Sequence, residues 1–315
     1  MPTDKDGRII LILTELKDST MDKDNRSQNI SADRFTILRA LGHREVDEKI
    51  RCPDGLAQFF LDEDWSEAIR FHKPILKRFE SSAPGAYGYC LARTKFMDKQ
   101  LDDAIAAGVT QVVILGSGFD TRAYRMNQDK SISFFELDKR QVHREKQVRS
   151  EHPEIPETNH CIFRIPVDFN KVDTETLLSS IDLDYTKPIV VLVEGLLYYM
   201  PECFFLSLLS FFRNKMLAQS RLIFDYAHSD LLRLDNQIYG AKEVGEFARN
   251  STEPFRYTII PEDLINLLSS FGFNIQQEMD HEDMAEQFLI DSSGKLAASP
   301  MGGFRLCSAD KSGVV

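Results

Sequence analysis

The sequence lacks any long hydrophobic run. No stretch approaches the roughly 18 uninterrupted apolar residues that a membrane-spanning helix requires. Near the N-terminus, the apolar segment 9–13 is too short for the hydrophobic region of a secretory signal peptide, and acids as well as bases precede it. We therefore expect a cytoplasmic protein without a membrane partner.

Paired cysteines and positive charge are also scarce. The five cysteines are scattered and form no Cys-x-x-Cys pair, so we expect neither a zinc site nor a disulfide framework, and we assign no metal. The formal net charge is -11 at pH 7, whereas a protein that binds nucleic acid needs a basic face to displace counterions. A small molecule is the expected partner, and the oligomeric state stays open.

The chain does contain enough apolar residues for a substantial core. Of its 315 residues 43% are hydrophobic, which suits one large globular domain or two small ones. Phe35, Leu38 and Leu41 recur at three-residue spacing, which predicts a helix that begins near Ser31. Further helical stretches are expected at 55–60, 65–79 and 87–105.

Beyond residue 108, short apolar runs alternate with helical patterns. Such alternation predicts a parallel sheet with right-handed crossovers. The strands are expected at 111–115, 133–137, 161–166, 189–193, 221–226, 273–278 and 304–308. The helices between them are expected near 140–150, 173–181, 202–217, 262–271 and 282–289. The last two strands have no long crossover between them, so an antiparallel hairpin can end the sheet.

The most informative segment is 111–138, QVVILGSGFDTRAYRMNQDKSISFFELD. Its first strand leads into Gly116 and Gly118, which let the backbone turn tightly and approach a ligand without an intervening Cβ. Asp138 lies at the tip of the next strand, 20 residues past Gly118. In nucleotide-binding α/β folds an acid at this place accepts hydrogen bonds from the ribose hydroxyls. The segment indicates a nucleoside cofactor, and a strand-turn-helix whose glycines serve only the turn is the plainer alternative.

Thr121 distinguishes this segment from a dinucleotide-binding turn. The dinucleotide motif requires a third glycine there, because that glycine lets the helix pack close beside a pyrophosphate. The bulky run 122–125 follows Thr121 and also argues against a pyrophosphate cradle. S-adenosylmethionine has no phosphate and suits the reduced motif better, so an NAD-dependent oxidoreductase is disfavoured.

Four segments of the chain carry a family resemblance: LGSGFDTRAYRM, FELD, EGLLYYMP at 194–201 and ARTKFMD at 92–98. Together they resemble the leucine carboxyl methyltransferase family of S-adenosylmethionine-dependent O-methyltransferases, from about residue 30 to the C-terminus. The resemblance implies an α/β fold with a Rossmann-like class I methyltransferase sheet, mostly parallel and ending in an antiparallel hairpin. An N-terminal helical lid is also implied.

These expectations divide the chain into three parts. Residues 1–28 are polar and mixed in charge, which predicts a flexible tail. A helical lid is expected at 29–108, and a core that binds S-adenosylmethionine at 109–315. Within the core, the segment 227–258 is interpreted as an insertion that closes over substrate.

The resemblance implies roles for the residues that follow the first three strands. Gly116 and Gly118 are expected beneath the methionine part and the ribose, and Asp138 on the ribose hydroxyls. Asp168 and Phe169 match a position that contacts adenine, where the carboxylate accepts from the exocyclic amine and the ring packs on the base. Asp168 could instead cap the helix that follows it.

Two further residues match positions near the methionine part of the cofactor. Arg93 matches an arginine that pairs with the methionine carboxylate, although it could simply pair with a helix neighbour such as Asp98. Glu194 matches an acid near the cofactor's amino group and sulfonium. Apolar residues flank Glu194 on both sides, and a buried carboxylate is rarely unpaired, so a structural ion pair is its alternative. Asp120 is expected to tie down the glycine turn, and Arg122 to pair within the fold.

Methyl transfer requires little of the protein beyond placing the acceptor oxygen in line with the methyl group. A carboxylate acceptor is already anionic, whereas a hydroxyl benefits from a base. His228, just past the fifth strand, is the candidate base, and an exposed loop histidine is the alternative. Tyr226 and Tyr198 are expected to line the acceptor pocket.

The sequence thus predicts a methyltransferase that acts on a hydroxyl or carboxyl oxygen of a small, polyketide-like or peptide-like metabolite. One alternative is a protein methyltransferase that esterifies a C-terminal leucine. Another, from a different functional class, is a non-catalytic protein that keeps the fold and binds the cofactor as a sensor or scaffold.

Overall fold

Seven strands form one sheet in the order β3-β2-β1-β4-β5-β7-β6 in the computed structural model, which describes residues 30–126, 128, 131–233, 237–250 and 254–313. The strands are β1 (Gln111–Leu115), β2 (Ser133–Asp138), β3 (Cys161–Pro166), β4 (Val190–Val193), β5 (Arg221–Ala227), β6 (Phe273–Met279) and β7 (Phe304–Lys311). Strands β1 to β5 pair in parallel, and β7 lies antiparallel between β5 and β6. The mostly parallel sheet with an antiparallel C-terminal hairpin is confirmed.

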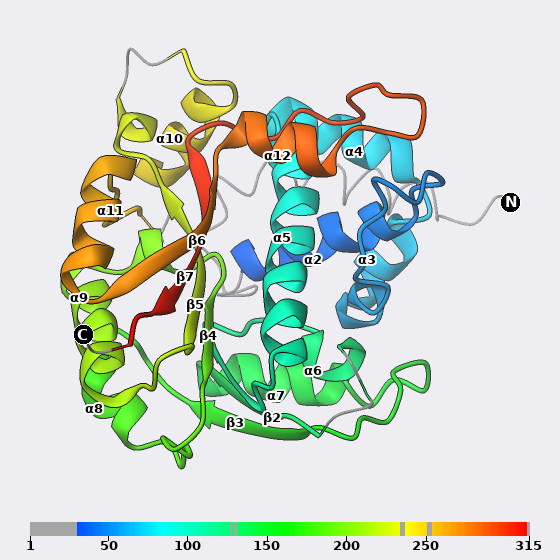
Figure 1. Ribbon diagram of the computed structural model, residues 1–315. Coiled ribbons are helices and arrows are strands. Elements are labelled where there is room, and N and C mark those ends of the chain that lie inside the picture. The colour runs from blue at the N-terminus through cyan, green and yellow to red at the C-terminus, as the bar shows by residue number, and fades with distance from the viewer. Residues whose placement is uncertain (1–29, 127, 129–130, 234–236, 251–253, 314–315) are drawn as a thin grey trace, which may run out of the picture.

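The sheet is covered on both faces, because alternate residues of each strand point in opposite directions. Val112 and Ile114 of β1 pack into a core with α5 (Ala86–Ala106), whereas Val113 and Leu115 pack into the opposite core. The opposite core is built with α8 (Thr174–Ser179), α9 (Glu202–Lys215) and α11 (Pro261–Ser270). Figure 1 shows α5 on one side of the sheet and α9 with α11 on the other.

Two short helices follow the strands that lie toward the β3 edge of the sheet. A single turn, α6 (Arg122–Arg125), follows β1, and α7 (Arg140–Arg149) follows β2. A buried ion pair joins α7 to β2, where Lys146 Nζ lies 2.8 Å from Glu136 Oε1. Both side chains are fully buried, so each compensates the charge of the other.

The N-terminal helices differ in part from the expectation. Helix α2 (Ile30–His43) and α5 form as predicted. The single helix expected at 65–79 is wrong, because the chain forms α3 (Glu63–Ala68) and α4 (His72–Ser82) instead. Pro74 explains the break, since its ring would clash with the carbonyl four residues earlier in a continuous helix but is tolerated in a first turn. The stretch expected at 55–60 is a short 3-10 helix, η1 (Ala57–Phe60).

The region 29–108 contributes to two parts of the fold. Helix α5 packs on the sheet, with Leu91 and Met97 fully buried in the core that also holds β1 residues. Helix α2 lies across the end of the sheet, where Arg39 Nη2 donates to the carbonyl of Phe119 at 2.9 Å and Arg39 Nε lies 2.8 Å from Asp54 Oδ2. The sheet and α2 therefore enclose a space between them.

The segment 227–258 contains η3 (Ser229–Leu232) and α10 (Ala241–Asn250), while 234–236 and 251–253 lie outside the described residues. It meets the start of α5 through the loop before β7, because Gly302 N donates to Tyr239 O and Met301 N donates to Gly85 O. Helix α12 (His281–Phe288) packs beside α5 (Figure 1). The predicted tail 1–28 also lies outside the described residues.

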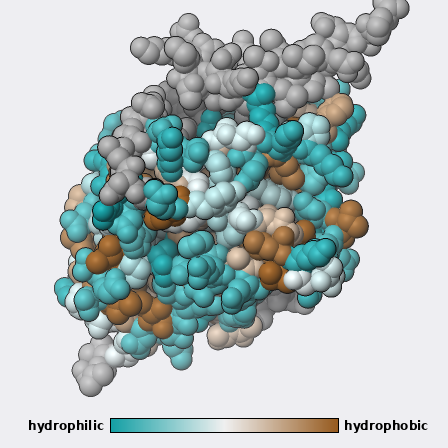
Figure 2. All heavy atoms as spheres, turned by 90° about the horizontal axis from the view of Figure 1, so that it is seen from above, coloured by the Kyte–Doolittle hydropathy of each residue, from teal (hydrophilic) through white to brown (hydrophobic). Residues whose placement is uncertain are grey.

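The surface agrees with this arrangement of buried cores. Figure 2 shows a mostly hydrophilic face with small, separate hydrophobic patches. Within the described ranges, no helix has both the length and the apolar character needed to cross a bilayer.

Candidate functional site

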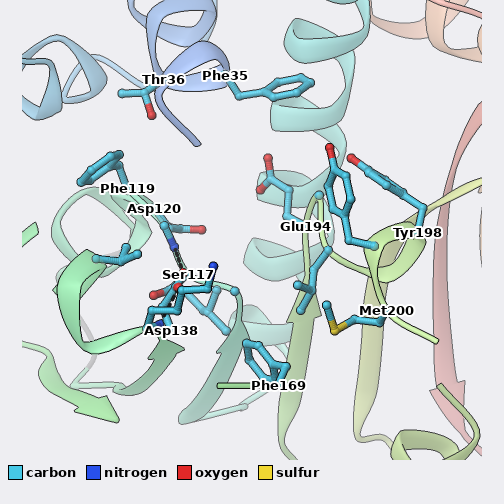
Figure 3. A pocket seen from close by; sticks show the side chains of 18 of the residues that line it. Phe35, Thr36, Ser117, Phe119, Asp120, Asp138, Phe169, Glu194, Tyr198 and Met200 are labelled. Atoms are coloured by element: carbon cyan, nitrogen blue, oxygen red, sulfur yellow. Dashed lines mark hydrogen bonds between the residues drawn. The ribbon is translucent and has the colours of Figure 1, made fainter. Parts of the chain in front are cut away.

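A cavity of about 340 Å³ lies between α2 and the carboxyl ends of the parallel strands. Ligands of open α/β sheets bind at this end, where the loops after successive strands converge. In Figure 3, Phe35 and Thr36 of α2 lie at one wall, Ser117 and Asp138 at another, and Glu194 opposite them. The cavity therefore collects residues from both the N-terminal helices and the sheet.

The turn after β1 needs its glycines. Gly116 has φ +68° and Gly118 has φ +43°, a region of backbone conformation that favours glycine. A Cβ on Gly116 would also lie 3.2 Å from the side chain of Leu196. The amide of Gly118 donates to Asp138 Oδ2 at 2.7 Å, so the carboxylate at the tip of β2 holds the turn. The glycine pair and the acid that the sequence singled out thus meet at one edge of the cavity.

Ser117 supplies an unsatisfied group at this turn. Its side chain is 3% exposed and lines the cavity, and its hydroxyl has no hydrogen-bond partner among the described residues. A buried hydroxyl without a partner costs free energy, and a ligand in the cavity can remove that cost. The turn is therefore suited to a polar ligand.

Asp168 and Phe169 follow β3 and line the same cavity. Asp168 accepts from the amide of Asn170 at 3.1 Å and pairs with Lys171 at 2.9 Å, and these hydrogen bonds, Lys171 first, lower its pKa. The cap of α8 is Asp173, which accepts from the amide of Thr176 at 2.9 Å. The alternative that Asp168 caps this helix is therefore wrong.

At the opposite edge, Arg93 of α5 is clamped by two carboxylates. Its Nη1 donates to Asp225 Oδ2 at 3.0 Å, and its Nε lies 3.0 Å from Glu194 Oε1 without the alignment of a hydrogen bond. Its guanidinium also lies 4.1 Å from the ring centre of Phe35. Asp98, the helix neighbour considered as its partner, pairs with arginines of α6 instead.

Glu194 is held at the end of β4 by a second arginine. Arg122 Nη1 donates to Glu194 Oε2 at 2.7 Å, and Asp120 in turn pairs with Arg122 at 2.5 Å. Burial by itself raises the pKa of Glu194, but the charges of Arg122 and Arg93 outweigh burial and hold it at about 2. Glu194 is therefore an anion at every physiological pH, with a side chain that is 11% exposed at the cavity.

Comparison with known proteins places this chain in a family. A model of the family described as "Leucine carboxyl methyltransferase" matches residues 32–213. The chain belongs to this family. The recognition made from the four sequence segments is confirmed.

Individual relatives agree with this membership. The "Putative S-adenosyl-L-methionine-dependent methyltransferase YktD" of Bacillus subtilis is 26% identical over 209 residues, 66% of this chain and 68% of that protein. A relative of the same description from Frankia alni is 30% identical, over 58% of this chain and 61% of that protein. The chain thus spans only about two thirds or less of the relatives it matches.

A solved structure shares the fold. A crystal structure of a DUF574 family protein from Streptomyces avermitilis has a TM-score of 0.58, with 13% identity, over 91% of this chain and 100% of that one. At this identity the likeness concerns the fold alone. The Rossmann-like class I methyltransferase sheet predicted from the sequence is confirmed.

Two of the three residues expected at the acceptor, His228 and Tyr226, do not line the cavity in the described part of the chain. His228 caps η3, and its Nδ1 accepts from the amide of Asp230 at 3.1 Å. Tyr226 donates to Glu278 Oε1 at 2.7 Å and points away from the cavity, because its neighbour Asp225 faces Arg93 and adjacent strand residues face opposite sides. The expected placement of His228 and Tyr226 at the cavity is therefore wrong, whereas the role of His228 as a base stays a prediction. Tyr198 is the expected residue that does line the cavity.

Asp225 is a residue that sequence reasoning missed. It lies near the end of β5 in the run RLIFDYA and is fully buried. The same signal that drew attention to Glu194, an acid flanked by apolar residues, could have found it. Because Asp225 contacts Arg93, it belongs to the charged edge of the cavity.

Proposed function

We propose that this protein transfers a methyl group from S-adenosylmethionine to a carboxylate oxygen of a small organic acid. The cofactor is S-adenosylmethionine. One observation carries the proposal: a single cavity joins a glycine turn and acid suited to a nucleoside, at Gly118 and Asp138, to a buried acid that is ionised at physiological pH, Glu194. S-adenosylmethionine brings a methyl group on a sulfonium, and the neutral thioether that departs when the methyl group is transferred, S-adenosylhomocysteine, is a good leaving group.

The two edges of the cavity match the two halves of this cofactor. Asp138 is suited to the ribose hydroxyls, and Phe169 offers an aromatic face to adenine while Asp168 can accept from its amine. The methionine half carries an ammonium, a carboxylate and the sulfonium, and the opposite edge carries Glu194 and Arg93. Glu194 would attract the positive groups, and the remaining donors of Arg93 would face the carboxylate.

The acceptor follows from the groups around the transfer site. No histidine lines the cavity within the described ranges. Glu194 has a pKa of about 2, and Asp120 is paired with Arg122, so neither suits the removal of a proton from an alcohol. Burial raises the pKa of Tyr198 well above its ordinary value. These groups favour an acceptor that arrives ionised, and the chain's task is to place it and exclude water.

Aromatic side chains suit an acceptor with an apolar body. The rings of Tyr198 and Tyr199 lie 4.7 Å apart, and Phe255 packs 4.9 Å from Tyr198 and 5.4 Å from Tyr199. Tyr198 and Tyr199 line the cavity beside Met200. This wall supports an aryl or branched aliphatic acid as the acceptor.

The test pairs each acid with its alcohol. The protein is incubated with methyl-labelled S-adenosylmethionine and matched partners such as phenylacetic acid and phenylethanol, alongside a peptide that ends in leucine. Label that enters the acids as a base-labile ester supports the proposal. Label only in the alcohols, or only in the peptide, overturns the acceptor class, and S-adenosylhomocysteine binding without transfer to any of them supports a non-catalytic protein.

A further inference from the structure

We infer that Asp225 is a positioning residue that sets the methionine-binding edge of the cavity; the inference rests on the proposed function. Its side chain is fully buried, so it cannot touch a ligand directly. It acts through Arg93 and Gly195, and both of these residues line the cavity.

The carboxylate of Asp225 divides its two oxygens between separate tasks. Oδ1 accepts from the backbone amide of Gly195 at 2.7 Å. Oδ2 accepts from Arg93 Nη1 at 3.0 Å and from the hydroxyl of Tyr89 at 2.5 Å. One buried carboxylate therefore links the corner after β4 to the arginine of α5. These two segments are far apart in the sequence.

Gly195 shows why this tie affects the site. It has φ +67°, and a Cβ there would lie 3.3 Å from Arg93 Nη1. The corner thus turns sharply with the guanidinium packed against it. Because Glu194 immediately precedes Gly195, the hydrogen bond to Asp225 also sets where the Glu194 side chain leaves the backbone.

An amide at this position cannot reproduce the arrangement. The substitution Asp225→Asn would leave one acceptor oxygen and introduce one NH₂ group, which would face an N–H donor of either Gly195 or Arg93. One of the two ties is then lost, and the donor left in a buried place is unsatisfied. The disturbance is expected at the methionine edge alone, since Asp138 and Phe169 are held by other elements.

Two ligands that differ only at this edge provide the test. S-adenosylhomocysteine has both the nucleoside and the amino-acid part, whereas 5′-methylthioadenosine lacks the amino-acid part. For Asp225→Asn, calorimetry should show S-adenosylhomocysteine binding weakened about tenfold or more, with 5′-methylthioadenosine binding changed by less than about twofold. Equal losses for the two ligands, or no loss for either, would overturn the inference.

Two further variants keep the test decisive. Asp310→Asn makes the same change in another acid–arginine pair of the sheet, where Asp310 Oδ1 lies 2.6 Å from Arg221 Nε, and it should leave both affinities unchanged. Tyr89→Phe removes one hydrogen bond to Asp225 and keeps the ring, so it should weaken S-adenosylhomocysteine selectively by about threefold to tenfold. If Asp225→Asn does not fold, Tyr89→Phe decides alone.

A wild-type protein that binds neither ligand would refute the proposed function itself. Wild-type binding of both, with Asp225→Asn and Tyr89→Phe unable to distinguish them, would refute only the role of Asp225.

Discussion

The two edges of the cavity are built over very different distances along the chain. At the edge proposed for the nucleoside (the nucleoside edge), Gly118 and Asp138 are 20 residues apart and meet where the turn after β1 lies beside the end of β2. At the edge proposed for the methionine part (the methionine edge), Arg93 and Asp225 are 132 residues apart and come from a helix and a distant strand. The first edge uses half-buried acids that accept hydrogen bonds from backbone amides, and the second uses buried ions.

This difference predicts how each edge responds to mutation. A buried ion that loses its partner stays in a low-dielectric place without compensation, so the whole fold loses stability. When an acid at the water-accessible rim of a turn is removed, water can replace the hydrogen bonds that the acid accepted. Changes at the methionine edge should therefore affect folding and binding together, and changes at the nucleoside edge should affect binding alone.

The largest effect is expected for Arg93→Ala. The change leaves Glu194 and Asp225 without their shared cation, and breaking such a buried pair typically costs about 3–5 kcal/mol. Urea unfolding followed by circular dichroism measures the loss. Arg221→Ala, which removes the half-buried partner of Asp310, should cost clearly less. If the two variants were equally stable, the distinction between buried and half-buried pairs would fail.

Asp138→Ala should act on binding and spare the fold. Loss of a charge-assisted acceptor is expected to weaken S-adenosylhomocysteine by roughly 1.5–3 kcal/mol, or about tenfold to a hundredfold in calorimetry. Asp173→Ala, the cap of α8, is the matched control: it should lower the stability of the fold slightly and leave affinity unchanged. Unaltered affinity in Asp138→Ala would contradict the placement of the ribose at this edge.

The pH dependence should be small in the working range. The pKa of Glu194 falls from 4.5 to about 2 on folding, so its contribution to stability is complete above pH 4.5 and is lost as the pH falls toward 2. Urea unfolding between pH 7 and 3 should show this loss, and Glu194→Gln should reduce it. A loss of S-adenosylhomocysteine binding centred between pH 5 and 7 would contradict the assignment of Glu194 as the titrating group.

The smallest effect is expected for His228→Ala. The imidazole caps a 3-10 turn outside the cavity, so its loss should cost about 1 kcal/mol of stability or less and change turnover by less than about twofold. Turnover is measured at saturating substrate on whichever acid or alcohol accepts the label. A hundredfold fall with intact cofactor affinity would restore the hydroxyl acceptor and its base.

Local patterns predicted much of this molecule. Short stretches of sequence contain the periodic patterns and boundary residues that predict the seven strands, the long helix before the first strand and the antiparallel ending. The helix expected at 65–79 failed because its apolar spacing continues through Pro74, whose steric effect outweighs the pattern. The position of His228 failed for another reason: closeness to a strand end does not determine which way a side chain points.

The sequence by itself determined the class of sheet, the glycine turn with Asp138, and the family. These features depend on the spacing of residues within one or two elements. Steric rules for glycine and for strands allow such spacing to be interpreted from the sequence alone. Only the tertiary structure decided that Arg93 is shared between Glu194 and Asp225, that Tyr226 faces away, and that no histidine borders the cavity in the described chain. The pairing of buried charges depends on residues that are far apart in the sequence. Any arginine can pair with any acid, so the actual pairs are known only once packing has brought particular side chains together.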